Sequence, residues 1–187
     1  MRFCALDIKT ANNDPSSICE IGIGTFEDGV LIDTFRTYVD PDCPIDLSYT
    51  EKVHGITDEM TNGFLTFDET YDYDGLRDKL ENKIIVHHSP FTRKAWEKAI
   101  RKYDLESFKI LWLDSETVAM KTWDEFFFGD CPLEYVVSRL GIDLEYPDAL
   151  SCAIAAGNIV LAACKKSAIG VVELFNQVEK GKTKKYI

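Results

Sequence analysis

The sequence lacks the features that mark several classes of protein. It contains no run of eighteen or more apolar residues, so we expect no membrane-spanning helix and no membrane partner. Its first residues, MRFCALDIKT, do not form a signal peptide, because the apolar stretch is short and contains an aspartate. These absences predict a cytoplasmic protein.

Motifs for zinc and for disulfide frameworks are also missing. The six cysteines are scattered along the chain without a CxxC pair. The three histidines, His54, His87 and His88, do not have the spacing that a zinc site with cysteine would need. We therefore expect reduced cysteines that pack as small apolar side chains.

Positive charge is scarce. The chain has 21 Lys and Arg against 32 Asp and Glu, a formal net charge of −11, which at long range repels nucleic acid. The exception is the C-terminal segment, which carries Lys180, Lys182, Lys184 and Lys185. We expect residues 1–175 to form one domain and residues 176–187 a basic, solvated tail.

The pattern of apolar residues predicts a mixed α/β domain. Residues 2–8, 18–26 and 30–39 read as three strands of a meander, with a hairpin turn at 27–29. Later segments with apolar patterns are a short segment around 49–54, a helix around Leu76 and Leu80, a buried strand at 84–90, a helix from Pro90, a strand in KILWLDS, a helix ending at Gly141, and an Ala-rich helix opened by Pro147. This order predicts a mixed sheet with helices on its faces.

Several of these segments carry a recognisable pattern. They are LDIKTANNDPSSICEIGI, YVDP, VHGITDEM, IIVHHSPFTR, VVSRLGIDL and PDALSCAIAAGNIVLAA, in this order and spacing. Together they resemble the DnaQ-like, or DEDDh, 3′–5′ exonucleases of the ribonuclease H-like fold, from Phe3 to about Ala163. The resemblance implies a mixed five-stranded sheet flanked by helices. It also implies hydrolysis of a terminal phosphodiester by two divalent metals that four carboxylates hold, with a histidine as general base.

The positions that the resemblance assigns to catalysis are mostly replaced. The Asp-x-Glu of the first strand is Asp7-Ile8-Lys9, and the next Asp of the pattern is Thr92. The general-base His falls on Pro147, and the last Asp falls on Cys152. One of the five groups, Asp7, is retained.

These replacements predict a pocket that does not bind metal. Asp7 and Lys9 are two residues apart, so on a strand they point to one face, where the ammonium can neutralise Asp7 in place of an ion. An alternative is that Lys9 reaches solvent from a pocket without function. We expect no Mg²⁺ or Mn²⁺ cofactor and no metal ligands.

The predicted function is that of a pseudo-nuclease, which binds single-stranded nucleic acid ends or a protein partner. The residues that we expect at a nucleic-acid site are Thr10, His54, His88 and Phe91, which belong to the matched segments. One alternative function is a 3′–5′ exonuclease with a remodelled metal site, which would need Mg²⁺ or Mn²⁺. Asp148 is its candidate ligand, although one helical turn separates it from Cys152 by about 5.4 Å. Another alternative, favoured by the acidic charge, is a scaffold that binds neither nucleic acid nor metal.

Overall fold

A computed structural model of the chain describes residues 1–73, 75–127 and 129–183. Three antiparallel strands form first: β1 (Arg2–Thr10), β2 (Ile18–Glu27) and β3 (Val30–Tyr38). Asp28 and Gly29 join β2 to β3, and both have positive φ, as a two-residue hairpin turn requires. The hairpin predicted at 27–29 is thus confirmed.

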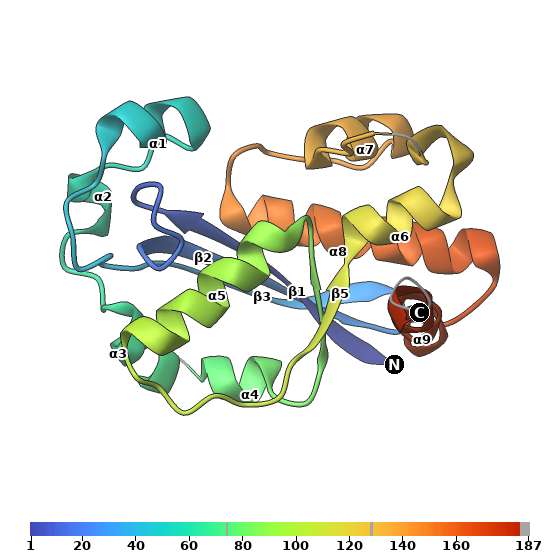
Figure 1. Cartoon of the computed structure of the whole chain (residues 1–187), viewed down its shortest axis with the longest axis horizontal. Coiled ribbons are helices and arrows are strands. Elements are labelled where there is room, and N and C mark those ends of the chain that lie inside the picture. Colours follow the sequence, from blue (N-terminus) through green and yellow to red (C-terminus); the bar gives the residue numbers. More distant parts are fainter. Residues whose placement is uncertain (74, 128, 184–187) are drawn as a thin grey trace.

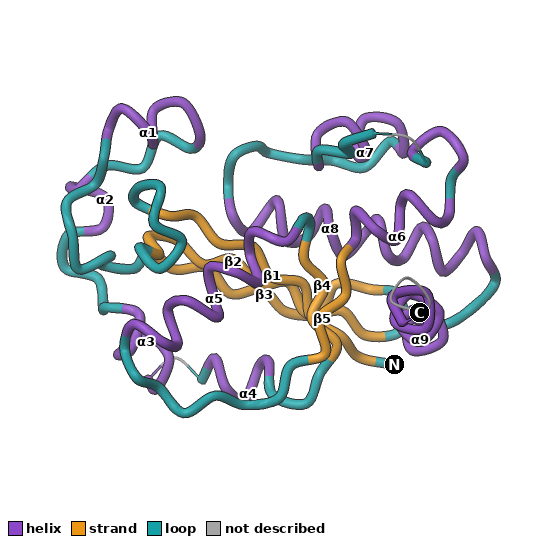
Figure 2. Tube along the Cα trace, viewed as in Figure 1, coloured by secondary structure: helices purple, strands orange, loops and turns teal. Residues whose placement is uncertain are grey.

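Two parallel strands complete the sheet. These are β4 (Ile84–His87) and β5 (Leu111–Asp114), and the strand order is β3-β2-β1-β4-β5 (Figure 2). β4 pairs in parallel with β1 and β5 pairs in parallel with β4. The mixed five-stranded sheet with flanking helices, as in the ribonuclease H-like fold, is the architecture that we predicted.

Helices cover both faces of the sheet. On one face lies α5 (Pro90–Lys102), whose Trp96 packs in a core cluster with Leu6 and Ile8 of β1. On the other face lies α8 (Ala149–Ser167), which packs with Ala5 of β1 and with β2 (Figure 1). Because successive side chains of β1 point to opposite faces of the sheet, β1 contributes apolar side chains to the core on each face.

The close approach of α8 to the sheet depends on a glycine. A Cβ at Gly22 of β2 would lie 2.3 Å from the backbone nitrogen of Leu150. Because that neighbour is backbone, it cannot move aside without shifting the helix. Gly22 thereby brings the first turn of α8 against the strand next to β1.

Short helices connect the main elements. Their bounds are α1 (Leu47–Val53), α2 (Asp58–Thr61), α3 (Phe67–Tyr73), α4 (Leu76–Leu80), α6 (Ser115–Thr122), a 3₁₀ turn at Asp124–Phe126, and α7 (Leu133–Leu140). The sequence patterns had not indicated α2, α3 or α6. The segment KILWLDS, expected to be a strand, ends its strand at Asp114, which is also the N-cap of α6.

Two boundaries differ from the expected ones. Pro147 does not open α8, because Asp148 is the N-cap and accepts a hydrogen bond from the Ser151 amide. At the C-terminus, α9 (Val171–Thr183) spans the boundary that we placed between residues 175 and 176, and its Val178 is buried. Lys184 and Lys185 of the expected tail lie outside the described residues.

One described helix, α8, is long and apolar enough by composition to cross a membrane. Half of the apolar window is buried inside the protein, where α8 packs on the sheet. A core helix of a folded domain passes the same test of length and composition, so the observation is weak evidence for a span.

Candidate functional site

The C-terminal end of β1 presents an ion pair. Asp7 and Lys9 share one face of the strand, and Lys9 Nζ lies 2.8 Å from Asp7 Oδ2. The Asp7 and Lys9 side chains are only 16% and 11% exposed. The pairing predicted from their spacing is present, and the alternative that Lys9 reaches bulk solvent is wrong.

Two residues from distant elements complete this cluster. Thr92, in the first turn of α5, donates a hydrogen bond from Oγ1 to Asp7 Oδ1 at 3.2 Å. Cys152, in the first turn of α8, accepts one from Lys9 Nζ at 3.5 Å. Each oxygen of Asp7 therefore faces a different donor, and the structure brings Asp7, Lys9, Thr92 and Cys152 together.

The electrostatics of the cluster favour a charged lysine and a neutral thiol. Burial is the largest single influence on the pKa of Lys9 and lowers it, but the charge and hydrogen bond of Asp7, together with the contact with Cys152, outweigh burial, and the net shift is upward. Burial, together with the charge of Asp7, raises the pKa of Cys152 to about 12. Near neutral pH the cluster therefore contains an ammonium, a carboxylate and a protonated thiol, which is a poor nucleophile.

A cavity of about 300 Å³ opens beside the ion pair. Its wall includes all four residues that we expected at a nucleic-acid site, Thr10, His54, His88 and Phe91, together with Asp7, Lys9 and Thr92. Phe91 is 37% exposed. Tyr49 and Tyr146 also line it, and sequence reasoning missed both because neither belongs to a matched motif.

The two histidines of the wall are held by the protein itself. His54 Nε2 donates to the Thr10 carbonyl at 3.0 Å, and its Nδ1 accepts from the Ile56 amide at 3.2 Å. This pattern requires a neutral ring. Burial lowers the pKa of His54, in agreement with that state. His88 bonds to the Ser115 hydroxyl and the Cys131 carbonyl, so it ties β4 to the α6 and α7 region.

Pro147 and Asp148 lie outside this cavity. Asp148 pairs with Arg36 of β3 at 2.7 Å, and Arg36 pairs at 2.7 Å with Glu20, a buried residue of β2. Burial raises the pKa of Glu20, although Arg36 opposes the shift. Pro147, Asp148, Glu20 and Arg36 line a separate cavity of about 220 Å³.

Solved structures with a similar architecture include several nucleases. Exonuclease X, solved in complex with 5′-overhanging duplex DNA, superposes with a TM-score of 0.71 at 16% identity over 94% of this chain and 99% of that one. The nuclease domain of 3′hExo, a DEDDh family member bound to rAMP, gives 0.62 at 17% identity over 87% and 90% of the two chains. E. coli exonuclease I in complex with a dA16 oligonucleotide superposes with a TM-score of 0.68 at 13% identity, over 94% of this chain and 42% of that one. The chain has the DnaQ-like exonuclease fold.

Sequence comparison agrees with this DnaQ-like fold. DNA polymerase III PolC-type of Thermotoga petrophila is 31% identical over 150 residues, which are 75% of this chain and 10% of that protein. The PolC-type polymerase of Clostridium perfringens is 33% identical over 89 residues, 46% of this chain and 6% of that protein. The chain thus spans about a tenth or less of the curated relatives that it matches. No protein-family model matches it.

The residues present in the DnaQ-like pocket do not fit a divalent cation. Asp7 is the single carboxylate of the cluster, and Lys9 and Thr92 occupy both of its oxygens. Over the described ranges, no group of three or more His, Cys, Asp or Glu side chains is arranged to hold a metal ion. An ion at the Asp7 carboxylate would have to displace the Lys9 ammonium.

Proposed function

We propose that this protein is a non-catalytic member of the DnaQ-like fold that uses its pocket to hold the end of a single-stranded nucleic acid. The observation that carries the proposal is the Lys9 ammonium 2.8 Å from Asp7. It stands where the resemblance places a metal-binding glutamate, so a positive side chain takes the place of a positive ion.

The charge balance supports loss of metal-dependent hydrolysis. An ammonium about 4 Å from a divalent ion is repelled by roughly 8 kcal/mol at an effective dielectric constant of 20. One carboxylate cannot offset this repulsion for two ions. The Cys152 thiol, with a pKa of about 12, does not replace the missing carboxylate as a ligand near neutral pH.

The wall of the pocket supports a nucleotide as ligand. The rings of Tyr49, Phe91 and Tyr146 can stack on a base or a sugar. The Lys9 ammonium has three N–H groups, of which Asp7 and Cys152 accept two, and it lies over one face of the Tyr146 ring, 5.6 Å from the centroid. The third can donate to an oxygen of the terminal nucleotide, so binding would need no divalent ion. The neighbours in fold include chains solved with DNA, an oligonucleotide and rAMP.

The rival function is an exonuclease with a remodelled metal site. It needs a new carboxylate, and Asp148 was the candidate. That side chain pairs with Arg36 and lines a different cavity, so it does not supply the ligand to Asp7. The geometry therefore favours binding over hydrolysis.

One experiment separates the two functions. A single-stranded oligonucleotide of roughly 20 nucleotides, long enough for such a site, is labelled at its 3′-terminal nucleotide and incubated with the protein in Mg²⁺, in Mn²⁺ and in chelator. We expect no release of nucleotide and, by fluorescence anisotropy, equal binding in all three buffers. An oligonucleotide with a 3′-phosphate tests whether the free end is recognised, and it should bind more weakly.

The control protein is the Asp7→Asn variant. Release of nucleotides by the parent protein that requires Mg²⁺ or Mn²⁺ and disappears in Asp7→Asn would refute the proposal in favour of the exonuclease. Absence of binding in every buffer would refute the nucleic-acid ligand and leave a protein partner as the ligand of this pocket.

A further inference from the structure

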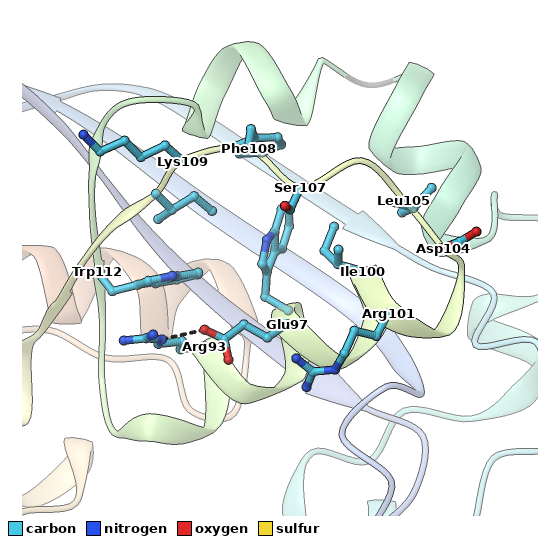
Figure 3. A pocket seen from close by; sticks show the side chains of 12 residues that line it. Arg93, Glu97, Ile100, Arg101, Asp104, Leu105, Ser107, Phe108, Lys109 and Trp112 are labelled. Carbon is cyan, nitrogen blue, oxygen red and sulfur yellow. Dashed lines mark hydrogen bonds and ion pairs between the residues drawn. The ribbon is translucent and has the colours of Figure 1, made fainter.

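A second cavity, of about 560 Å³, lies between α5 and the segment that leads into β5 (Figure 3). Its walls include the rings of Trp96, Phe108 and Trp112. Trp112 is on β5, which is an edge strand of the sheet, and its ring is half-buried. The groove is thus aromatic on its inner side and open to solvent.

The rim of this groove has more cations than carboxylates in an acidic protein. Its charged residues give it a net charge of +1, whereas the whole chain has −11; they are Arg93, Arg101 and Lys109 against Glu97 and Asp104. In the groove, Arg93 is paired with Glu97 at 2.7 Å. Arg101 and Lys109 also line it, and neither forms an ion pair with any part of the chain that the structure describes. Two cations are therefore available to an anionic ligand.

The groove adjoins the pocket of the Asp7–Lys9 pair. Phe91 and Thr92 line that pocket, and Arg93, the next residue of the same helix, lines the groove. On the strand side, the Trp112 ring contacts the ring of His87, which precedes His88 of the pocket wall. A chain that leaves the pocket over the first turn of α5 would enter the groove directly.

We propose that this groove binds the continuation of the single-stranded nucleic acid whose end occupies the Asp7–Lys9 pocket, an inference that rests on the function proposed above. A base stacks on Trp112, and Arg101 and Lys109 contact the phosphates; the Phe108 ring is stacked on Tyr71 and covered by Arg77, so it closes the wall of the groove and is not a stacking platform. Aromatic rings beside a basic rim are the combination with which proteins bind single strands without reading sequence. An acidic peptide would satisfy the cations but would leave the aromatic wall without partners that stack.

The test compares a long and a short ligand. A single-stranded oligonucleotide of roughly 20 nucleotides can reach the groove, whereas one of about three nucleotides fills only the pocket. The Arg101→Glu/Lys109→Glu variant should weaken binding of the long ligand by about tenfold or more at low salt and lower the slope of log K against log salt by about 1.4. Binding of the short ligand should stay unchanged.

A matched control carries the same change of net charge elsewhere. Lys165→Glu/Lys166→Glu alters two exposed cations at the end of α8, away from both cavities, and should weaken the long ligand much less. A second readout is tryptophan fluorescence. Stacking on Trp112 should quench it with the long ligand only, and Trp112→Phe, which keeps a ring beside His87, should remove that quenching.

Each outcome decides between the two proposals. Two results would refute the groove and leave the proposal for the pocket intact. One is that the short ligand binds and the long ligand binds no more tightly. The other is that the control variant weakens binding of the long ligand as much as the groove variant does. If neither ligand binds, both proposals fail. If polyglutamate competes with the long ligand as well as an oligonucleotide does, the groove binds anions without stacking and the assignment to nucleic acid is wrong.

Discussion

Replacing Lys9 by methionine tests whether the ion pair organises the pocket. Methionine keeps an unbranched apolar stem but removes the ammonium. Asp7 Oδ2 is buried and has no hydrogen-bond partner within the described residues other than this ammonium. The variant therefore leaves a carboxylate oxygen buried without its counter-charge.

The expected loss is large for a single substitution. At 2.8 Å and an effective dielectric constant of 20, the attraction between Lys9 and Asp7 is about 6 kcal/mol, part of which offsets the cost of burying both charges. Removal of one partner from a buried pair costs roughly 3–5 kcal/mol. For a chain of this size that corresponds to a fall of roughly 10 °C in Tm.

Denaturant unfolding at pH 7 measures this loss, with two companions. Asp7→Asn/Lys9→Met removes both charges and keeps an acceptor for Thr92, so it should recover most of the stability that Lys9→Met loses. Lys79→Met is the matched control, because Lys79 pairs with Asp33 at 3.0 Å on the surface. Its effect should be much smaller, since exposed pairs are screened by solvent.

A result within about 1 kcal/mol of the parent for Lys9→Met would refute the reasoning, because it would put the pair in the range of surface ion pairs. A double variant that is less stable than Lys9→Met would also refute it. In that case an unpaired Asp7 charge could not be the cause of the loss. Either outcome would show that the ion pair does not organise the pocket.

Two further predictions concern protonation and metal binding. Because the folded state lowers the pKa of His54 below 6.5, the unfolded state binds the extra proton, and stability should fall as the pH drops below that value. The His54→Gln variant should lose less unfolding free energy than the parent between pH 7.5 and 5.5. An unchanged pH dependence of the unfolding free energy would contradict the neutral ring. A triple variant, Lys9→Glu/Thr92→Asp/Cys152→Asp, groups three new carboxylates with Asp7. Because these carboxylates repel one another, the variant should be less stable than the parent in chelator. At Mn²⁺ concentrations about a hundredfold above Kd, its Tm should rise by roughly 5–10 °C. A folded triple variant that calorimetry shows not to bind Mn²⁺ would mean that the backbone no longer converges at this site.

Local spacing determined part of the architecture and one part of the site. The alternation of β1 predicted that Asp7 and Lys9 share a face, because side chains of a strand repeat every two residues. The apolar runs and the Asp28–Gly29 turn predicted the meander in the same way. The short helices α2 and α3 have too few turns for a period to be evident, and these were missed.

Long-range packing decided the rest. Thr92 and Cys152 lie 85 and 145 residues from Asp7, so no local spacing rule connects them, and only the resemblance assigned them to the site. In the structure, α5 and α8 pack on opposite faces of β1, and this packing brings their first turns to one end of the strand. The same packing sets Asp148 against Arg36 instead of Asp7. The net charge of −11 is a sum over the whole chain, whereas a ligand experiences the local charge. Only the tertiary structure places Arg101 of α5, Lys109 and the ring of Trp112 along one groove.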